Sequence, residues 1–283
     1  MTLEKWLVTG PKVIDLELVR SLKVSLIRGQ VDVIGHDEPG ARVEVHSVSG
    51  KDLKITMDGD KLEIDHPQLR WDNFIDVFSS FRGTAQADIS ILVPRDVALK
   101  FGVVASSALI SGLVSDARIN TVSGDVVIDQ LTGNIDLNAV NGELSIQRHS
   151  GNIRARTVSG DITASGEIRR FNAESVSGNM FVDLTGTPDE INTNSVSGDL
   201  TVRLAEGIGA RYRVNTVSGT LQLDGTTVKG TFGRGYNSTT GSLDGTWVDI
   251  AANSVSGDLS VIRHPAARAA DTAHTDTAPA ESK

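Results

Sequence analysis

Apolar and polar residues alternate along most of the chain. In Ile135-Asp136-Leu137, Leu144-Ser145-Ile146 and Leu200-Thr201-Val202, every second side chain is aliphatic. A period of two is typical of a strand with one buried side, whereas a helix repeats its apolar positions every three or four residues. Frequent Val, Ile, Thr and Gly also disfavour helix. The pattern therefore predicts an all-β protein.

A short motif recurs through the C-terminal two-thirds of the chain. Val-Ser-Gly, usually preceded by Thr or Ser and followed by Asp or Asn, ends the alternating segments and lets the chain turn. With weaker copies included, the turn glycines between Gly124 and Gly160 lie nine residues apart, and a full unit has about 18–22 residues. The strong copies end at Gly124, Gly160, Gly178, Gly198, Gly219 and Gly257.

One such unit is too small to bury its own apolar side. Identical coils stacked about 4.8 Å apart solve this, because their aliphatic side chains form continuous internal ladders. Crossovers between parallel strands are nearly always right-handed. We therefore predict a right-handed parallel β-solenoid (β-helix) with coils of about 18–22 residues. The residues expected to point inward include Ile135, Leu137, Leu144, Ile146, Ile153 and Ile162.

The sequence divides into four segments. Residues 1–65 alternate but lack regular Ser-Gly turns, which predicts a β-rich N-terminal cap or irregular first coils. Residues 66–85 form an aromatic insertion, and residues 86–263 form the solenoid repeat. Residues 264–283 are mostly Ala, Thr, Asp, Pro and other polar or charged residues, which predicts a disordered tail.

The aromatic insertion breaks the aliphatic pattern. Its rings are spaced as on one face of a helix, which predicts one short amphipathic helix. Two interpretations remain open. The helix covers an open end or edge of the solenoid, or it forms an exposed patch that binds a partner or a second copy. The candidate partner patch consists of Trp71, Phe74, Phe78 and Phe81.

Acidic or amide residues often follow the turn glycines, as in Asp125, Asp161 and Asp199. Calcium-binding β-rolls use Gly-Gly-x-Gly-x-Asp turns, and the single glycine per turn here disfavours calcium. We expect these side chains to hydrogen-bond the turn backbone and their neighbours in the stack. The histidines show no metal-ligand spacing. We therefore predict no metal site and no cofactor.

The sequence offers little support for catalysis. The outward positions between Val126 and Ile162 mix Asp129 and Asp136 with Arg154 and neutral residues, without the acidic cluster that a glycan-cleaving enzyme needs. No Gly-x-Ser-x-Gly elbow is present. The absence of cysteine excludes disulfides, thiolate metal sites and cysteine catalysis. We predict no enzymatic activity and no catalytic residues.

Charge and hydropathy restrict the partners and the location. A net charge of −9 argues against nucleic acid and against anionic lipid surfaces. No run approaches 18 apolar residues, so we expect no transmembrane segment. The N-terminus lacks the long apolar run of a signal peptide. We therefore expect a cytoplasmic location, with the cell surface reached only by an unrecognised export route.

Three features carry a resemblance to a known family. They are the Thr-Val-Ser-Gly-Asp-Ile/Leu repeat (residues 121–126, 157–162, 195–200 and 254–259), the stretch Ile-Ser-Ile-Leu-Val-Pro-Arg-Asp (residues 89–96) and the N-terminal alternating strands. Through them, nearly all of residues 1–263 resembles the bacterial putative-adhesin family of β-strand-repeat proteins, a domain of unknown function. The resemblance implies a β-solenoid with a binding role and supplies no catalytic residues.

We therefore expect a non-enzymatic interaction scaffold that binds an unidentified protein or glycan, as a monomer or weak homo-oligomer. One alternative is a self-assembling structural solenoid that stacks end to end. The third is a polysaccharide-acting β-helix enzyme.

Overall fold

The computed structural model describes residues 3–66, 85–229 and 235–264. Within these ranges the chain is all β, because the alternating segments form strands and the glycine-containing segments form the turns between them. The strands are β1 (Leu3–Val8), β2 (Lys12–Leu16), β3 (Ser21–His36), β4 (Ala41–Ser49), β5 (Leu53–Asp58), β6 (Lys61–Asp65), β7 (Gln86–Pro94), β8 (Ala98–Ser111), β9 (Ala117–Ser123), β10 (Val126–Asp129), β11 (Thr132–Asn141), β12 (Leu144–Ser159), β13 (Ile162–Ser177), β14 (Met180–Leu184), β15 (Glu190–Ser197), β16 (Leu200–Ala205), β17 (Gly209–Ser218), β18 (Thr220–Leu223), β19 (Thr226–Lys229), β20 (Tyr236–Thr240), β21 (Trp247–Ser256) and β22 (Leu259–His264).

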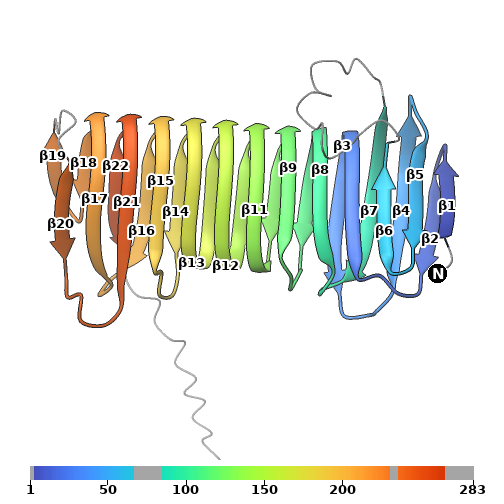
Figure 1. Cartoon of the computed structure of the whole chain (residues 1–283), viewed down its shortest axis with the longest axis horizontal. Helices are drawn as coiled ribbons and strands as arrows, with labels where there is room; N and C mark the ends of the chain where they lie inside the picture. Colours follow the sequence, from blue (N-terminus) through green and yellow to red (C-terminus); the bar gives the residue numbers. More distant parts are fainter. Residues whose placement is uncertain (1–2, 67–84, 230–234, 265–283) are drawn as a thin grey trace, which may run out of the picture.

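Successive coils stack into two parallel sheets (Figure 1). Most coils give one strand to sheet A and, after a turn that contains glycine, one strand to sheet B, whereas β3 and β8 run through both sheets. In spatial order, sheet A contains the first halves of β3 and β8, then β9, β11, the second halves of β12 and β13, β15, β21 and β17. Sheet B contains the second halves of β3 and β8, then β10, the first halves of β12 and β13, β14, β16, β22 and β18.

Aliphatic side chains of neighbouring coils stack into ladders between the two sheets. Leu144, for example, pairs with Val126 on one side and with Ile162 on the other. The six residues predicted to point inward are at most 2% exposed, which confirms the predicted alternation of inward and outward positions. Each fully buried aliphatic side chain contributes about 1.5–3 kcal/mol of hydrophobic stabilisation. The stacked parallel coils confirm the predicted architecture, and its right-handed winding stays a prediction.

The turn glycines also allow neighbouring coils to approach each other. Gly160 has φ +141°, and a Cβ added there would lie 2.2 Å from the carbonyl oxygen of Gly142 in the preceding coil. A side chain at this position would therefore strain the backbone and push the two coils apart.

Residues 3–65 take part in both sheets. β3 pairs in parallel with β8, and on its other side it pairs in parallel with β6 in sheet A and with β7 in sheet B. Antiparallel pairing then adds β5 and β1 to sheet A, and β4 and β2 to sheet B. This region therefore supplies the coil formed by β3, the parallel strand β6 and the antiparallel strands at the end of the stack.

At the other end, the last coil in sequence is not the last in space. β21 pairs in parallel with β15 on one side and with β17 on the other, while β22 lies between β16 and β18. Residues 247–264 thus insert between residues 190–205 and 209–223, as the colours of Figure 1 show. β20 and β19 then pair antiparallel with β17 and β18.

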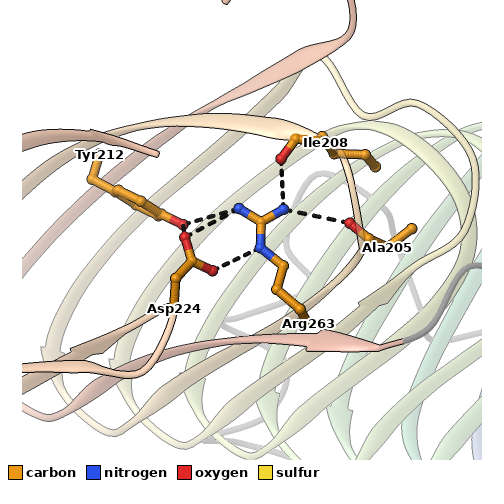
Figure 2. Close-up of polar contacts among 5 residues, drawn as sticks. All are labelled: Ala205, Ile208, Tyr212, Asp224 and Arg263. Carbon is orange, nitrogen blue, oxygen red and sulfur yellow. Dashed lines mark hydrogen bonds and ion pairs between the residues drawn. The ribbon is translucent and has the colours of Figure 1, made fainter. Parts of the chain in front are cut away.

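Arg263 ties the inserted coil to its neighbours (Figure 2). Its guanidinium donates to both carboxylate oxygens of Asp224, at 2.7 and 3.1 Å, and to the carbonyls of Ile208 (2.6 Å) and Ala205 (3.4 Å). The Tyr212 hydroxyl donates to the same carboxylate at 2.7 Å. Burial alone would raise the pKa of Asp224, but the hydrogen bonds from Arg263 and Tyr212 outweigh it and lower this pKa. The cluster therefore holds an ionised carboxylate as a structural clamp.

Several predictions fall outside the described residues. The amphipathic helix, with Trp71, Phe74, Phe78 and Phe81, lies in residues 67–84, and all but one residue of the predicted tail lies in residues 265–283. Both stay predictions. Within the described ranges the structure contains no helix, and so none that could cross a membrane.

Candidate binding groove

A shallow groove of about 600 Å³ crosses the outer surface of sheet A over β8, β9, β11, β12 and β13. Coils repeat every 18 residues in this part of the stack, as the pairing of Arg118 with Asp136 and of Asp136 with Arg154 shows. Outward side chains of equal phase therefore line up across the strands. Two such rows carry the polar side chains of the groove.

The first row consists of register partners in five consecutive coils. Arg118 Nε lies 3.3 Å from Asp136 Oδ2, so these two charges form an ion pair. Arg154, on the other side of Asp136, is exposed and forms no ion pair with a described residue. The complete row is Lys100, Arg118, Asp136, Arg154 and Asn172.

The second row is a chain of hydrogen bonds from Asp116 to Asn152, followed by a cation in the next coil. Asp116 Oδ1 accepts hydrogen bonds from the backbone N–H (2.8 Å) and the Nδ2 (3.0 Å) of Asn134. Asn134 Oδ1 in turn accepts from Asn152 Nδ2 at 2.8 Å. Arg170 follows as the register partner of Asn152, exposed and without a hydrogen bond or ion pair of its side chain to the described residues.

Ion pairing distinguishes the groove arginines from the others in the repeat. Ten arginines between residues 118 and 263 belong to the described ranges, and eight of them have a carboxylate oxygen within 4.0 Å. The two without such a partner are Arg154 and Arg170, and both line the groove. These two cations on neighbouring strands therefore form no ion pair with the described residues, although Arg154 is the register partner of Asp136 and Arg170 that of Glu190.

Alternation alone does not reveal these rows. Of the outward positions noted in the sequence, Asp136 and Arg154 lie in the groove, while Asp129 pairs with Arg148 in sheet B. The signal that finds the site is an 18-residue spacing of polar residues, at 100, 118, 136, 154 and 172 and at 116, 134, 152 and 170. The predicted partner patch, at residues 71–81, lies outside the described residues.

The Asp and Asn residues after the turn glycines bond up the stack, as predicted. Asp161 Oδ1 accepts from the Asn179 N–H at 2.7 Å, and Asn179 Oδ1 accepts from the Asp199 N–H at 3.0 Å. Asp199 Oδ1 accepts from the Asp258 N–H at 2.8 Å, which extends the ladder into the inserted coil. Among the residues placed by the structure, no three His, Asp or Glu side chains gather into a group that could hold a metal.

Two histidines are part of the core. His66 is fully buried, its Nδ1 accepts a hydrogen bond from the Ile27 N–H at 3.3 Å, and burial lowers its pKa to about 4. His149 is 1% exposed, and burial also lowers its pKa. Both are therefore neutral near pH 7 and pack inside the stack.

Solved structures with a similar chain course are distant in sequence. A putative cell adhesion protein from Clostridium sporogenes is 14% identical, with a TM-score of 0.28, over 90% of this chain and 100% of that one. A putative adhesin from Bacteroides fragilis is 11% identical (TM-score 0.36), and a putative lipid binding protein from Parabacteroides distasonis is 12% identical (TM-score 0.37); each match covers 89% of this chain and 97% of the other. At these identities and TM-scores, none of the three carries weight for the function of this chain.

No curated protein matches the sequence significantly. The Toastrack DUF4097 family, in contrast, matches residues 19–262, which span both sheets from β3 to β22. This match confirms the resemblance to a repeat family that is a domain of unknown function. Because it covers most of the chain, the protein belongs to the Toastrack DUF4097 family.

Proposed function

We propose that the protein is a non-enzymatic binding scaffold that holds its ligand along the groove on sheet A. The observation that carries this proposal is that Arg154 and Arg170, alone among the described arginines of residues 118–263, have no carboxylate partner within ion-pair distance among the described residues. Exposed arginines that form no ion pair can donate charge-assisted hydrogen bonds to an anionic group that binds between or along them.

The strands under the groove suit a preorganised site. β9, β11 and the sheet A halves of β12 and β13 are hydrogen-bonded on both sides, so the backbone of each row is fixed by its neighbours. Sites built on such strands hold their side chains more closely in place than sites on loops. A ligand therefore meets a surface that needs little reordering on binding.

The carboxylates of the groove favour binding over catalysis. Asp136 is paired with Arg118, and Asp116 accepts two hydrogen bonds from Asn134. A glycan-cleaving enzyme needs one carboxyl group that stays protonated as an acid and a second that acts as base or nucleophile. Both carboxylates of the groove are instead engaged by neighbouring groups of the protein.

The ends of the stack argue against end-to-end assembly. Both ends finish in short antiparallel strands, β1 and β2 at one end and β19 and β20 at the other, which have four to six residues each. Short edge strands with charged residues such as Lys5, Lys12 and Lys229 are a common protection against further strand pairing.

An array of glycans and peptides, probed with the labelled full chain, tests the proposal. The variant Arg154→Glu/Arg170→Glu reverses the groove charges, and the control Lys12→Glu/Lys229→Glu makes the same change in net charge at exposed positions outside the groove. We expect at least one ligand that the groove variant loses and the control retains. Binding that both variants lose equally, or that neither loses, would contradict a groove site. Release of cleaved products from a bound ligand would contradict a non-enzymatic role.

A further inference from the structure

The charge of the groove indicates the sign of its ligand. Within a chain of net charge −9, the groove lining holds four cations against two carboxylates. Asp136 neutralises Arg118, so the cations without an ion pair to a described residue are Lys100, Arg154 and Arg170. We infer that the groove binds an acidic polysaccharide, and that the anionic groups on its sugars contact these three side chains. This inference rests on the proposed function.

The spacing of the cations favours a polymer. Lys100 and Arg154 stand three coils apart in the same row, which is about 14 Å at the usual strand separation. Arg170 stands one coil beyond Arg154, in the second row. One small anion cannot reach both Lys100 and Arg154, whereas a chain with repeated charges can lie across the strands and contact all three.

The groups between the cations suit hydroxyl-rich sugars. Asn134, Asn152 and Asn172 line the groove, and amide groups donate to and accept from sugar hydroxyls. No Trp, Tyr or Phe is among the described residues that line it. The lining therefore offers no stacking platform for nucleic-acid bases, which single-strand binders use for affinity.

An extended peptide fits the groove less well. Peptides that bind β-sheet proteins in extended form commonly add a strand at a free sheet edge, so that main-chain hydrogen bonds supply the affinity. The groove runs across β8, β9, β11, β12 and β13, whose sheet A segments are paired on both sides, so no strand edge is available there. No described residue of its lining is an aromatic anchor of the kind that dominates peptide hot spots.

The test measures binding of the full chain to polygalacturonate, which carries carboxylates, and to dextran sulfate, which carries sulfates. Neutral dextran, poly-glutamate and single-stranded DNA serve as comparison polymers. We expect binding to one or both acidic polysaccharides and none to dextran. Raising the salt from 0.1 to 1 M should weaken it at least about tenfold, because the screening length falls from about 10 to about 3 Å.

Variants locate the binding. Arg154→Gln/Arg170→Gln should lose about tenfold or more in affinity, because each arginine donates charge-assisted hydrogen bonds. Lys12→Gln/Lys229→Gln should bind as the unchanged protein does. Galacturonate oligomers should bind more tightly with length until they span Lys100 to Arg170, and the monomer should not bind.

The outcomes separate the two proposals. Equal binding of dextran, tighter binding of poly-glutamate or DNA, or salt-independent binding would overturn the polysaccharide assignment while leaving a groove ligand in place. The polysaccharide assignment would also be overturned if the array yields ligands that depend on Arg154 and Arg170 but no acidic polysaccharide binds. Absence of any ligand that depends on Arg154 and Arg170 would overturn the binding groove and this inference together.

Discussion

Replacing Gly160 with alanine should destabilise the middle of the stack more than a typical surface substitution does. The backbone there has φ +141°, a conformation that residues with side chains rarely adopt, and it costs about 1–3 kcal/mol. The new Cβ would also lie 2.2 Å from the Gly142 carbonyl oxygen, so the two coils must separate. Separation strains the nearby bond between these two coils, from the Leu144 N–H to the Asp161 carbonyl (2.9 Å).

This backbone bond contributes about 1 kcal/mol, so the total loss in the free energy of unfolding should be about 2–4 kcal/mol. Alanine substitutions at two other glycines distinguish the cost of backbone strain from the cost of the close contact between coils. Gly207 has φ +87° but nothing within 4 Å of an added Cβ, so Gly207→Ala should cost only about 1–2 kcal/mol. Gly10 has neither a left-handed φ nor a close neighbour, so Gly10→Ala should change stability by about 0.5 kcal/mol or less.

Urea unfolding of the three variants measures these differences. Hydrogen exchange, which reports local opening, should show lost protection in the coils next to Gly160 and unchanged protection in β3. If Gly160→Ala unfolds at the same urea concentration as Gly207→Ala, close contact between coils is not what requires glycine at the turns.

Three further substitutions test the core, the clamp and a buried histidine. Ile146→Asp should lower the free energy of unfolding by at least about 3 kcal/mol because it buries an unpaired carboxyl group. Thr163→Asp, at a partly exposed position of its strand, should be nearly neutral. Similar urea midpoints for the two variants would contradict the assignment of inward and outward positions. Arg263→Met should lower the free energy of unfolding by about 2–4 kcal/mol because it leaves the Asp224 carboxylate buried without its partner. Arg156→Met, which removes an exposed ion pair, should lower it by about 1 kcal/mol or less. Equal losses in the two variants would show that the Arg263 cluster has no special role in stability. His66 binds its proton near pH 6.5 when unfolded but near pH 4 when folded, so its contribution to stability is present above pH 6.5 and falls by up to about 3 kcal/mol toward pH 4. His66→Asn should flatten this part of the stability curve between pH 7 and 4, and an unchanged slope would exclude His66 as its cause.

The alternation and the Ser-Gly turns were sufficient to predict the parallel stack and the inward residues, because burial of one strand side leaves a single allowed phase. They were not sufficient to predict the position of the last coil. Residues 195–202 and 254–261 differ only at Thr201 and Ser260, so the two coils offer nearly identical stacking surfaces. Sequence order then suggests sequential stacking, and the choice depends on contacts such as those of Arg263 that no local pattern reveals.

The groove was hidden for a related reason. Lys100, Arg118 and Arg154 are separated by many residues, and each taken alone is an ordinary outward residue of a strand. Their juxtaposition follows only when the coil length is applied to polar as well as apolar positions. Which cations lack a counter-charge depends on side-chain geometry, since Arg118 and Arg154 are both register partners of Asp136 and only Arg118 forms the ion pair.

The insertion of residues 247–264 between two earlier coils also constrains when the molecule can be completed during synthesis. At about 5–20 residues per second, β17 leaves the ribosome about 2–8 s before β21, the strand on which it finally stacks. During that interval the edge of β15 and β16 is open and offers β17 and β18 a surface much like their final one. A nascent coil that pairs there must detach before β21 and β22 can enter. The outermost coil therefore reaches its final place only after residue 264 has been translated.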